Sequence, residues 1–322
     1  MITRHALGLS LLLAWPLAAQ DRLPPVDPAA TRKIDLVEVP PVPEGTPALR
    51  MLVIGDWGTG TRDQKAVAAA MATRARAERP DLIVTTGDNF YPRGVRSADD
   101  KLWEVAFERI YDDPALKEVP WWPSLGNHDH HGDVDAQVQY SQKSPRWRFP
   151  ARHHTTSFPL GEGASLQLFV LDTNPLMHRK EPEQLEWLDR ELGHSKATWK
   201  VVVGHHPVRS RSIRGDSPQL VEQLEPLLFR HQVELYLAGH DHCLELLKPI
   251  QGLTYLVSGG GAGPGWAYRV EWTEDLDYAA TGGGFALLRF TPTDCWIEFV
   301  RNDAKTQFAK VLTKPGARLG PY

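Results

Sequence analysis

The amino-acid sequence predicts an α/β fold. Short apolar runs end again and again in a glycine followed by a polar residue, and stretches with helical spacing lie between several of these runs. Hydrophobic side chains make up 42% of the 322 residues and charged side chains 24%, which is typical of a folded globular protein. A chain of this length buries a sizeable core without disulfide support.

The first elements form a strand–helix–strand unit. An apolar strand is expected at residues 51–54, a helix at about 63–78, and a second strand at 82–86, which indicates a parallel pair. The same alternation continues along the chain, with leucines at helical spacing in 185–192 and 220–228. Further strands are expected at 120–125, 166–171, 200–203, 234–237 and 254–257. The last two strands, at 285–290 and 296–300, have little sequence between them and are expected to pair antiparallel.

The N-terminal region has the pattern of an export signal. Arg4 precedes an apolar run, and the small residues Ala18 and Ala19 follow it, so residues 1–19 are expected to be a signal peptide. The run is shorter than the roughly 20 residues of a spanning helix, so stable membrane insertion is not expected. An uncleaved anchor or a disordered tail is the alternative. Residues 20–48 are proline-rich and suit a linker, which leaves 49–322 as the folded domain.

Composition excludes some classes of function. The net charge of −4 argues against a basic surface for nucleic acids. The two cysteines, Cys243 and Cys295, are too few for a disulfide scaffold; export would permit them to pair, but the sequence leaves this open. The sequence lacks four common motifs of enzymes and nucleotide-binding proteins. These are a P-loop with its lysine, a complete dinucleotide-binding fingerprint, H-E-x-x-H and G-x-S-x-G.

Side chains able to bind a metal follow five of the expected strands directly. Ligands of open α/β sheets bind at the carboxyl ends of strands, and a glycine before each of these side chains lets the chain turn sharply and lets the loops crowd one centre. Taken singly, each has a plain structural explanation, such as a helix N-cap for an aspartate. Their joint occurrence predicts a metal site. The residues are Asp56, Asp88, Asn127, His205 and the pair His240 and His242.

The donor types narrow the choice of metal. Carboxylate, amide, phenol and imidazole groups suit iron, zinc or manganese better than copper(I) or an iron–sulfur cluster. With Tyr91 there are seven candidate side chains, more than one catalytic ion with an open position needs. They suit two ions about 3.5–4 Å apart that share one carboxylate, as in hydrolytic two-metal sites.

Five sequence blocks resemble those of the purple acid phosphatases, which belong to the calcineurin-like metallophosphoesterases. The small, single-domain tartrate-resistant type is the most similar, and the likeness covers residues of about 50 to 320. Most calcineurin-like enzymes have a histidine where this chain has Gly58, and the tyrosine three residues after Asp88 is typical of the purple enzymes. The blocks are Asp56-Trp57-Gly58, Gly87-Asp88-Asn89-Phe90-Tyr91, Gly126-Asn127-His128-Asp129, Gly204-His205-His206 and Gly239-His240-Asp241-His242.

The resemblance implies a fold, an activity and a ligand set. The fold would be a two-sheet β-sandwich flanked by helices, with a dinuclear metal site at the carboxyl ends of the strands. The activity would be hydrolysis of phosphate monoesters at acid pH, with attack by a metal-bound hydroxide. The ferric ion would be held by Asp56, Asp88, Tyr91 and His242. The divalent ion, which is iron, zinc or manganese, would be held by the bridging Asp88 with Asn127, His205 and His240.

Three further residues are predicted to act on the substrate. By resemblance, His128 binds phosphate and protonates the leaving group, and we infer that Asp129 orients it. Arg214 lies where animal members have another histidine; arginine is a poor proton donor but a good phosphate clamp. Its loop also holds Lys200, Arg209 and Arg211, so it has either a local excess of positive charge or a merely solvated surface. His206 either faces the substrate or lies on an exposed rim.

The sequence therefore predicts an exported acid phosphatase, secreted or periplasmic, that acts as a monomer on small phosphate esters. A phosphodiesterase or nucleotidase on the same metals is the alternative enzyme. A secreted binding protein that keeps the metals without turnover is the alternative from another class, and the intact His128 and ligand set argue against it. The preference for monoester or diester separates the two enzymes.

Overall fold

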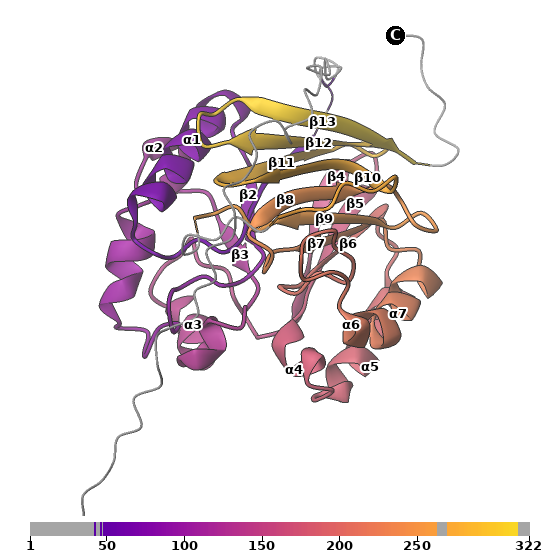
Figure 1. The fold of residues 1–322 in the computed structure, drawn as a ribbon, viewed down its shortest axis with the longest axis horizontal. Coiled ribbons are helices and arrows are strands. Elements are labelled where there is room, and N and C mark those ends of the chain that lie inside the picture. The colour runs from indigo at the N-terminus through magenta and orange to yellow at the C-terminus, as the bar shows by residue number, and fades with distance from the viewer. Residues whose placement is uncertain (1–41, 43–45, 47, 263–268, 315–322) are drawn as a thin grey trace, which may run out of the picture. The chain divides into compact units, whose positions relative to one another are not determined.

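The computed structural model describes residues 42, 46, 48–262 and 269–314. Two β-sheets lie face to face, and helices cover the outer side of each (Figure 1). This confirms the α/β sandwich that the sequence predicts. The expected signal peptide (1–19) lies outside the described residues, and so does nearly all of the expected linker (20–48).

The first sheet has the strand order β13-β12-β11-β1-β2-β3. Its strands are β1 (Leu49–Ile54), β2 (Leu82–Thr85), β3 (Trp121–Pro123), β11 (Gly284–Phe290), β12 (Asp294–Arg301) and β13 (Thr306–Thr313). β1, β2 and β3 are parallel, in the register that places Met51 opposite Leu82 and Ile83 opposite Trp121. The three late strands are antiparallel, and β11 pairs directly with β1. The parallel pair β1–β2 and the antiparallel pairing of β11 with β12 were predicted, whereas β13 was not.

The second sheet has the strand order β10-β8-β9-β7-β6-β5-β4. Its strands are β4 (His154–Gly161), β5 (Ala164–Val170), β6 (Trp199–Val203), β7 (Leu235–Ala238), β8 (Cys243–Leu247), β9 (Thr254–Ser258) and β10 (Leu276–Thr281). β5, β6, β7 and β9 are parallel, and the other three pair antiparallel. The sequence analysis missed β4 because this edge strand is partly exposed and rich in Thr and Ser, with no apolar run to mark it.

Each sheet has its own group of helices. On the side of the first sheet lie α1 (Arg62–Glu78), a π-helical turn (Trp103–Glu108), α2 (Pro114–Lys117) and α3 (Val134–Tyr140). On the side of the second lie α4 (Thr173–Met177), α5 (Pro182–His194), α6 (Pro218–Gln223) and α7 (Glu225–Arg230), as Figure 1 shows. The Thr61 hydroxyl caps α1 by accepting from the Gln64 amide, and α5 buries Leu188 and Leu192, four residues apart.

The alternation of β1 places its side chains in two cores. Leu52 and Ile54 pack with Val67 of α1, while Met51 is buried on the opposite face of the strand, toward the second sheet. There the Ser258 hydroxyl of β9 donates to the Val53 carbonyl at 2.8 Å. The two sheets therefore share one apolar interior, and the ends of their parallel strands lie at a common edge.

Large rings fill the helix-covered core beside the first sheet. Trp57, the residue after Asp56, is fully buried and has aromatic centroids around it at 5.4–6.4 Å. The surrounding rings are Phe90, Phe107, Tyr111, Trp121 and Trp147. Removing a ring of this size from a core costs about 3–5 kcal/mol. The packing of Trp57 therefore fixes the path of the chain where it leaves β1, and with it the position of the neighbouring Asp56.

Both cysteines are buried free thiols, so the pairing that the sequence left open is not made in the structure. Cys243 begins β8 of the second sheet, whereas Cys295 lies in β12 of the first. Burial raises the pKa of each thiol well above its usual value. Among the described residues, no helix is both long and apolar enough to cross a membrane.

Candidate active site

The parallel strands bring the predicted ligands together at one edge of the sandwich. Asp56, Asp88 and Asn127 follow β1, β2 and β3 of the first sheet. His205 and His240 follow β6 and β7 of the second, and His242 directly precedes β8. Each sheet therefore contributes the carboxyl ends of parallel strands, where ligands of α/β proteins bind.

Three of these side chains, from Asp56, Asp88 and His242, converge on the hydroxyl of Tyr91. Its oxygen lies 2.9 Å from Asp88 Oδ2, 3.1 Å from Asp56 Oδ1 and 3.2 Å from His242 Nε2. Burial and the two neighbouring carboxylates raise the pKa of Tyr91 well above its usual value. Burial opposes protonation of His242, but its contact with Asp56 outweighs this and raises the pKa of the imidazole. These are the four residues expected around a ferric ion.

A second group of donors converges on His205. Its Nδ1 donates to the Thr86 carbonyl at 2.8 Å, so in the neutral ring Nε2 carries a lone pair. That nitrogen lies 3.1 Å from both Asn127 Oδ1 and His240 Nδ1, and 3.5 Å from Asp88 Oδ1. An N–H group of His240 can donate to this nitrogen. The contacts of the nitrogen with Asn127 Oδ1 and Asp88 Oδ1 would then each join two hydrogen-bond acceptors. A cation between these atoms would turn the repulsive contacts into ligand bonds, so the donor set fits a metal.

Asp88 joins the two groups. Its Oδ2 faces Tyr91, while its Oδ1 lies near His205 and accepts from the His128 amide at 2.8 Å. Metal-capable atoms of Asp56, Asp88 and His205 lie within 4.8 Å of one another. The carboxylate is almost fully buried and has one oxygen toward each group, as a bridging ligand requires.

Three of the predicted ligands have a left-handed backbone. Asp56, Asp88 and His240 have φ of 59°, 49° and 66°. Such conformations cost on the order of 1 kcal/mol each in a residue with a side chain, and they concentrate at functional sites. The sequence analysis expected the preceding glycines to make these turns, but of the five only Gly87, with φ of 91°, has that conformation.

The other expectation for these glycines, close approach of the loops, is confirmed. A Cβ on Gly126 would lie 2.2 Å from the Asp88 amide nitrogen, and one on Gly239 would lie 2.5 Å from Asp56 Oδ2. Gly58, which is not one of these five glycines, is also crowded, because a Cβ there would lie 1.7 Å from the Asn89 carbonyl oxygen. The Gly58 carbonyl accepts from the Tyr91 amide at 3.0 Å. The loop after β1 therefore lies directly on the loop that carries Tyr91, which leaves no room for a side chain at position 58.

His128 lies beside the ligand group. Its ring centroid is 4.5 Å from that of Tyr91, and its Nδ1 is 2.7 Å from the Pro92 carbonyl oxygen. Because Nδ1 donates to this carbonyl, Nε2 is the ring nitrogen that remains for another partner. The structure thus places His128 next to the predicted ligands, with its ring held by backbone.

The structure corrects the prediction that Asp129 orients His128. The Asp129 carboxylate is fully buried and accepts from the backbone amides of Asn89, Phe90 and Gly126 at 3.0, 3.2 and 2.8 Å. It also accepts from Gln137 Nε2 at 2.8 Å. Burial and the charge of Asp88 raise its pKa to about 6. Asp129 thus ties the loops after β2 and β3 together and does not hold the imidazole.

The loop that carries Arg214 is neutralised, which corrects the expected excess of positive charge. Arg209 pairs with Glu225 and Asp216 at 2.6 and 2.7 Å, and Arg211 pairs with Asp216 and Asp275 at 2.8 and 2.5 Å. These guanidinium groups are engaged with carboxylates of the second half of the chain.

Arg214 itself lies next to the ligand block. Its Nε is 3.6 Å from Asp241 Oδ1, and Asp241 stands between the predicted ligands His240 and His242. The buried Asp241 carboxylate also accepts from the hydroxyls of Ser210 and Ser212 at 2.6 and 2.7 Å. The sequence analysis did not single out these serines.

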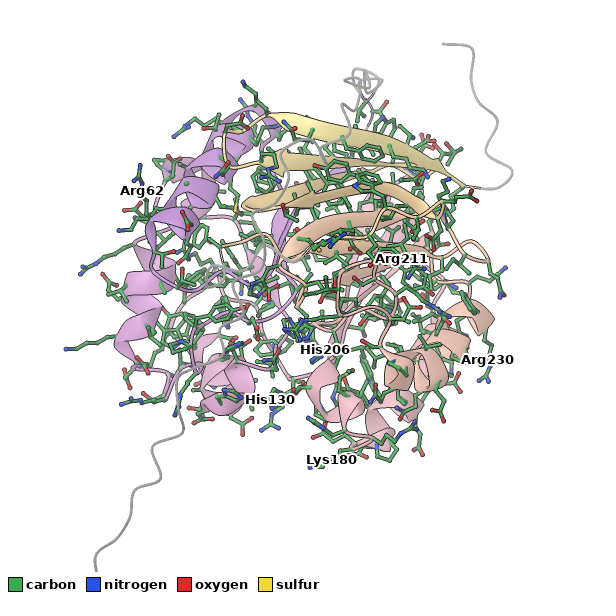
Figure 2. The ribbon with its side chains drawn as sticks, viewed as in Figure 1. Arg62, His130, Lys180, His206, Arg211 and Arg230 are labelled. Atoms are coloured by element: carbon green, nitrogen blue, oxygen red, sulfur yellow. The ribbon has the colours of Figure 1, made fainter. Side chains whose placement is uncertain are left out.

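The residues after β5 contact two histidines, His130 and His206; the sequence analysis gave His130 no role and left His206 open between the substrate and an exposed rim. Asp172 is fully buried and its carboxylate lies 2.9 Å from His130 Nε2, which raises the pKa of that imidazole although burial opposes it. Thr173 Oγ1 lies 2.9 Å from Nδ1 of His206, which is 5% exposed, so His206 is not an exposed rim residue. Figure 2 labels both histidines near the meeting of the two halves of the domain. In the sequence, Asp172 directly follows an apolar run, as the predicted ligands do. This pattern could have identified the end of β5 as a further part of the site.

Comparison with known proteins shows consistent likenesses. The model of the calcineurin-like phosphoesterase domain matches residues 49–244. Tartrate-resistant acid phosphatase type 5 of Sus scrofa is 34% identical over 303 residues, 84% of this chain and 88% of that protein. Purple acid phosphatase 4 of Arabidopsis thaliana is 32% identical over 295 residues, 84% and 85% of the two chains. The structure of GAP50, the anchor in the inner membrane complex of Plasmodium, has a TM-score of 0.75 at 24% identity over 83% of this chain and 89% of that one; this likeness concerns the fold alone.

Proposed function

Because the chain belongs to the purple acid phosphatases, within the calcineurin-like metallophosphoesterases, we propose that it hydrolyses small phosphate monoesters at acid pH on a centre of one ferric and one divalent ion. Its relatives are acid phosphatases by name, and the chain is an acid phosphatase with a dinuclear metal site. The observation that carries the proposal is the convergence of the seven donor side chains, with Asp88 between the two groups.

The oxygen-rich group suits the ferric ion. Asp56, Asp88 and Tyr91 offer three anionic oxygens beside His242, and a trivalent charge is best placed among such donors. The geometry supports this assignment, because the buried Tyr91 hydroxyl lies between the Asp56 and Asp88 carboxylates and completes the group of oxygen donors.

The nitrogen-rich group suits a divalent ion, which is iron, zinc or manganese. Its donors would be Asn127, His205 and His240 with the shared Asp88. When bound, the two ions acidify water and neutralise charge on the phosphoryl group.

The remaining residues would bind and protonate the substrate. His128, whose Nδ1–H is anchored on the Pro92 carbonyl, would in its imidazolium form donate the proton of Nε2 to the leaving oxygen. Arg214, whose side chain is 45% exposed beside Asp241, would contact a phosphoryl oxygen. Asp129 would act only by holding the loop of His128 against that of Asp88.

The test is hydrolysis of p-nitrophenyl phosphate and of bis(p-nitrophenyl) phosphate by the metal-loaded chain from residue 20 to 322, between pH 4 and 8. We expect the monoester to be preferred, with the highest turnover in acid. A diester preference would instead favour the phosphodiesterase. Two bound ions without turnover of either ester would favour the binding protein.

We also propose that the chain is exported, to the periplasm or the medium, and acts as a monomer. The support for export is the apolar N-terminal run before Ala18 and Ala19. Mass spectrometry of the exported product should give a chain that begins at Gln20. A product that begins at Met1 would contradict the cleavage.

A further inference from the structure

His206 is a buried histidine beside the nitrogen-rich group with no role in the proposed mechanism. Its ring centroid lies 4.5 Å from that of His240 and 4.9 Å from that of His205. A ring nitrogen of His206 lies within 4.8 Å of nitrogens of both neighbours, so by position it belongs to the metal-binding cluster. Two roles are compatible with this position: a further metal ligand, or a hydrogen-bond donor to whatever the metals bind.

The hydrogen bonds of Thr173 decide between these roles. The Thr173 hydroxyl oxygen accepts from the backbone amides of His205 and His206, at 3.2 and 3.1 Å. These two bonds occupy both of its lone pairs, so its own proton is directed to the remaining partner, His206 Nδ1, at 2.9 Å. Nδ1 is therefore an acceptor, and in the neutral ring the proton lies on Nε2.

This tautomer makes His206 a donor. A metal ligand must present a lone pair, but the Nδ1 lone pair is used by Thr173 and Nε2 carries hydrogen. His205 is the contrasting case, because its Nδ1 donates to the Thr86 carbonyl and leaves Nε2 free of hydrogen. At the same edge of the sheet, His205 therefore presents a lone pair on Nε2, whereas His206 presents an N–H group there.

The position of His206 is fixed on three sides. The Tyr236 hydroxyl donates to its carbonyl at 2.8 Å, Thr173 holds its Nδ1, and the His240 ring covers one face. Arg214 and His130 are close enough to His206 to act on it electrostatically, and Figure 2 shows the labels of His130 and His206 in the same part of the molecule. An N–H donor that packs beside two proposed ligands of the divalent ion is close enough to serve an anion bound there.

We propose that His206 is a phosphate-binding residue, whose Nε2–H donates to an oxygen of the phosphoryl group bound at the divalent side. The proposal rests on the proposed function. It also assigns Thr173 as a positioning residue, since the threonine hydroxyl selects the tautomer.

The test compares variants of His206 in the metal-loaded chain, with inorganic phosphate as the probe and calorimetry as the measurement. His206→Phe keeps a ring but has no donor, and we expect phosphate affinity to fall about tenfold, the value of one hydrogen bond to an anion. His206→Gln places an amide N–H near the position of Nε2 and should stay within about threefold of the wild type. His153→Phe, at a ring that packs on Trp187, is the matched control and should bind phosphate normally.

The metal content of each variant separates donor from ligand. We expect two ions per chain in His206→Phe by elemental analysis; loss of one ion would show a metal ligand and overturn the proposal. Unchanged phosphate affinity in a variant with both ions would overturn it as well. If His206→Phe does not fold, His206→Asn replaces it, because its shorter amide does not reach the position of Nε2. Calorimetry needs no turnover, so an inactive wild-type chain would refute the proposed function without deciding this one.

Thr173→Val supplies an independent measurement. Without the hydroxyl, the proton of His206 is free to move to Nδ1, and phosphate affinity should fall while both ions remain. Thr173→Ser keeps the hydroxyl and should restore it. Equal phosphate affinity in the Val and Ser variants would contradict the role of Thr173.

Discussion

The first sheet supplies the site with oxygen donors and the second supplies it with nitrogen donors. Asp56, Asp88 and Asn127 follow strands of the first sheet, whereas His205 and His240 follow strands of the second. The two halves are also secured differently. Backbone amides surround Asp129 on the oxygen side, while the Thr173 hydroxyl and the Thr86 carbonyl orient the rings of His206 and His205 on the nitrogen side. Each proposed ion takes ligands from both halves, so metal binding would join the two sheets.

The shared carboxylate should have the largest effect of any single residue. Asp88→Ala removes the only proposed ligand of both ions, so we expect loss of both and a fall in kcat/KM for p-nitrophenyl phosphate of about 10³-fold. Asn127→Ala removes a donor of the divalent ion alone and should keep the ferric ion. Elemental analysis with steady-state kinetics measures both. Two ions retained in Asp88→Ala would refute the bridge.

The second sheet, which supplies the nitrogen donors, should lose stability in acid. We test this at His154 of β4, because this residue is not one of the proposed metal ligands. Burial lowers the pKa of His154 to about 4. The unfolded chain therefore binds the proton first as pH falls from about 6.5, and the free energy of unfolding declines by at most about 3 kcal/mol by pH 4. His154→Phe should remove this part of the pH dependence in denaturant titrations. The comparison at pH 7, where both forms are uncharged, is the control; equal slopes below pH 6.5 would contradict the assignment.

A matched pair of carboxylates tests how the two halves are held. Asp129→Asn turns an amide NH₂ toward backbone N–H groups that cannot reorient, and we expect the free energy of unfolding at pH 7 to fall by about 2 kcal/mol. Asp241→Asn faces the hydroxyls of Ser210 and Ser212, which rotate to accept, and should cost less than about 1 kcal/mol. Equal losses in denaturant unfolding would remove the distinction.

Tyr91→Phe should lower turnover far less than Asp88→Ala does. The phenol is expected on the ferric ion and not on the substrate, and Phe keeps the packing against His128, so kcat should change about tenfold or less. The visible absorption of the iron-loaded chain should disappear, because a ferric phenolate would produce it. Absorption spectra of both chains give the answer, and a surviving band would place Tyr91 outside the ferric site.

The sequence predicted the parallel strands and the grouping of the donors, because both follow from local patterns. Buried parallel strands are apolar runs, and their carboxyl ends meet at one edge whatever the order of strands in the sheet. The left-handed backbone of Asp56 and Asp88 was not predictable in this way, since it depends on contacts between loops that are distant in sequence.

The errors have the same origin. Asp129 is next to His128 in the chain, but backbone amides from the loop after β2 take both of its oxygens. Arg209 and Arg211 look cationic in the sequence, whereas Asp216 and Asp275 neutralise them in three dimensions. The local sequence predicted which residue types make up the site. The hydrogen-bond and ion-pair partners of these residues were visible only in the tertiary structure.

The place of β11 in the first sheet has a consequence for the order in which the chain is made. Every proposed ligand has been synthesised by His242, yet one edge of β1 stays unpaired until β11, at Gly284–Phe290, is made. β1 positions Asp56. A chain that ends before β11 therefore contains all the proposed ligands but lacks the strand that pairs with β1. Correct placement of Asp56 therefore depends on β11, a strand that is made after every proposed ligand.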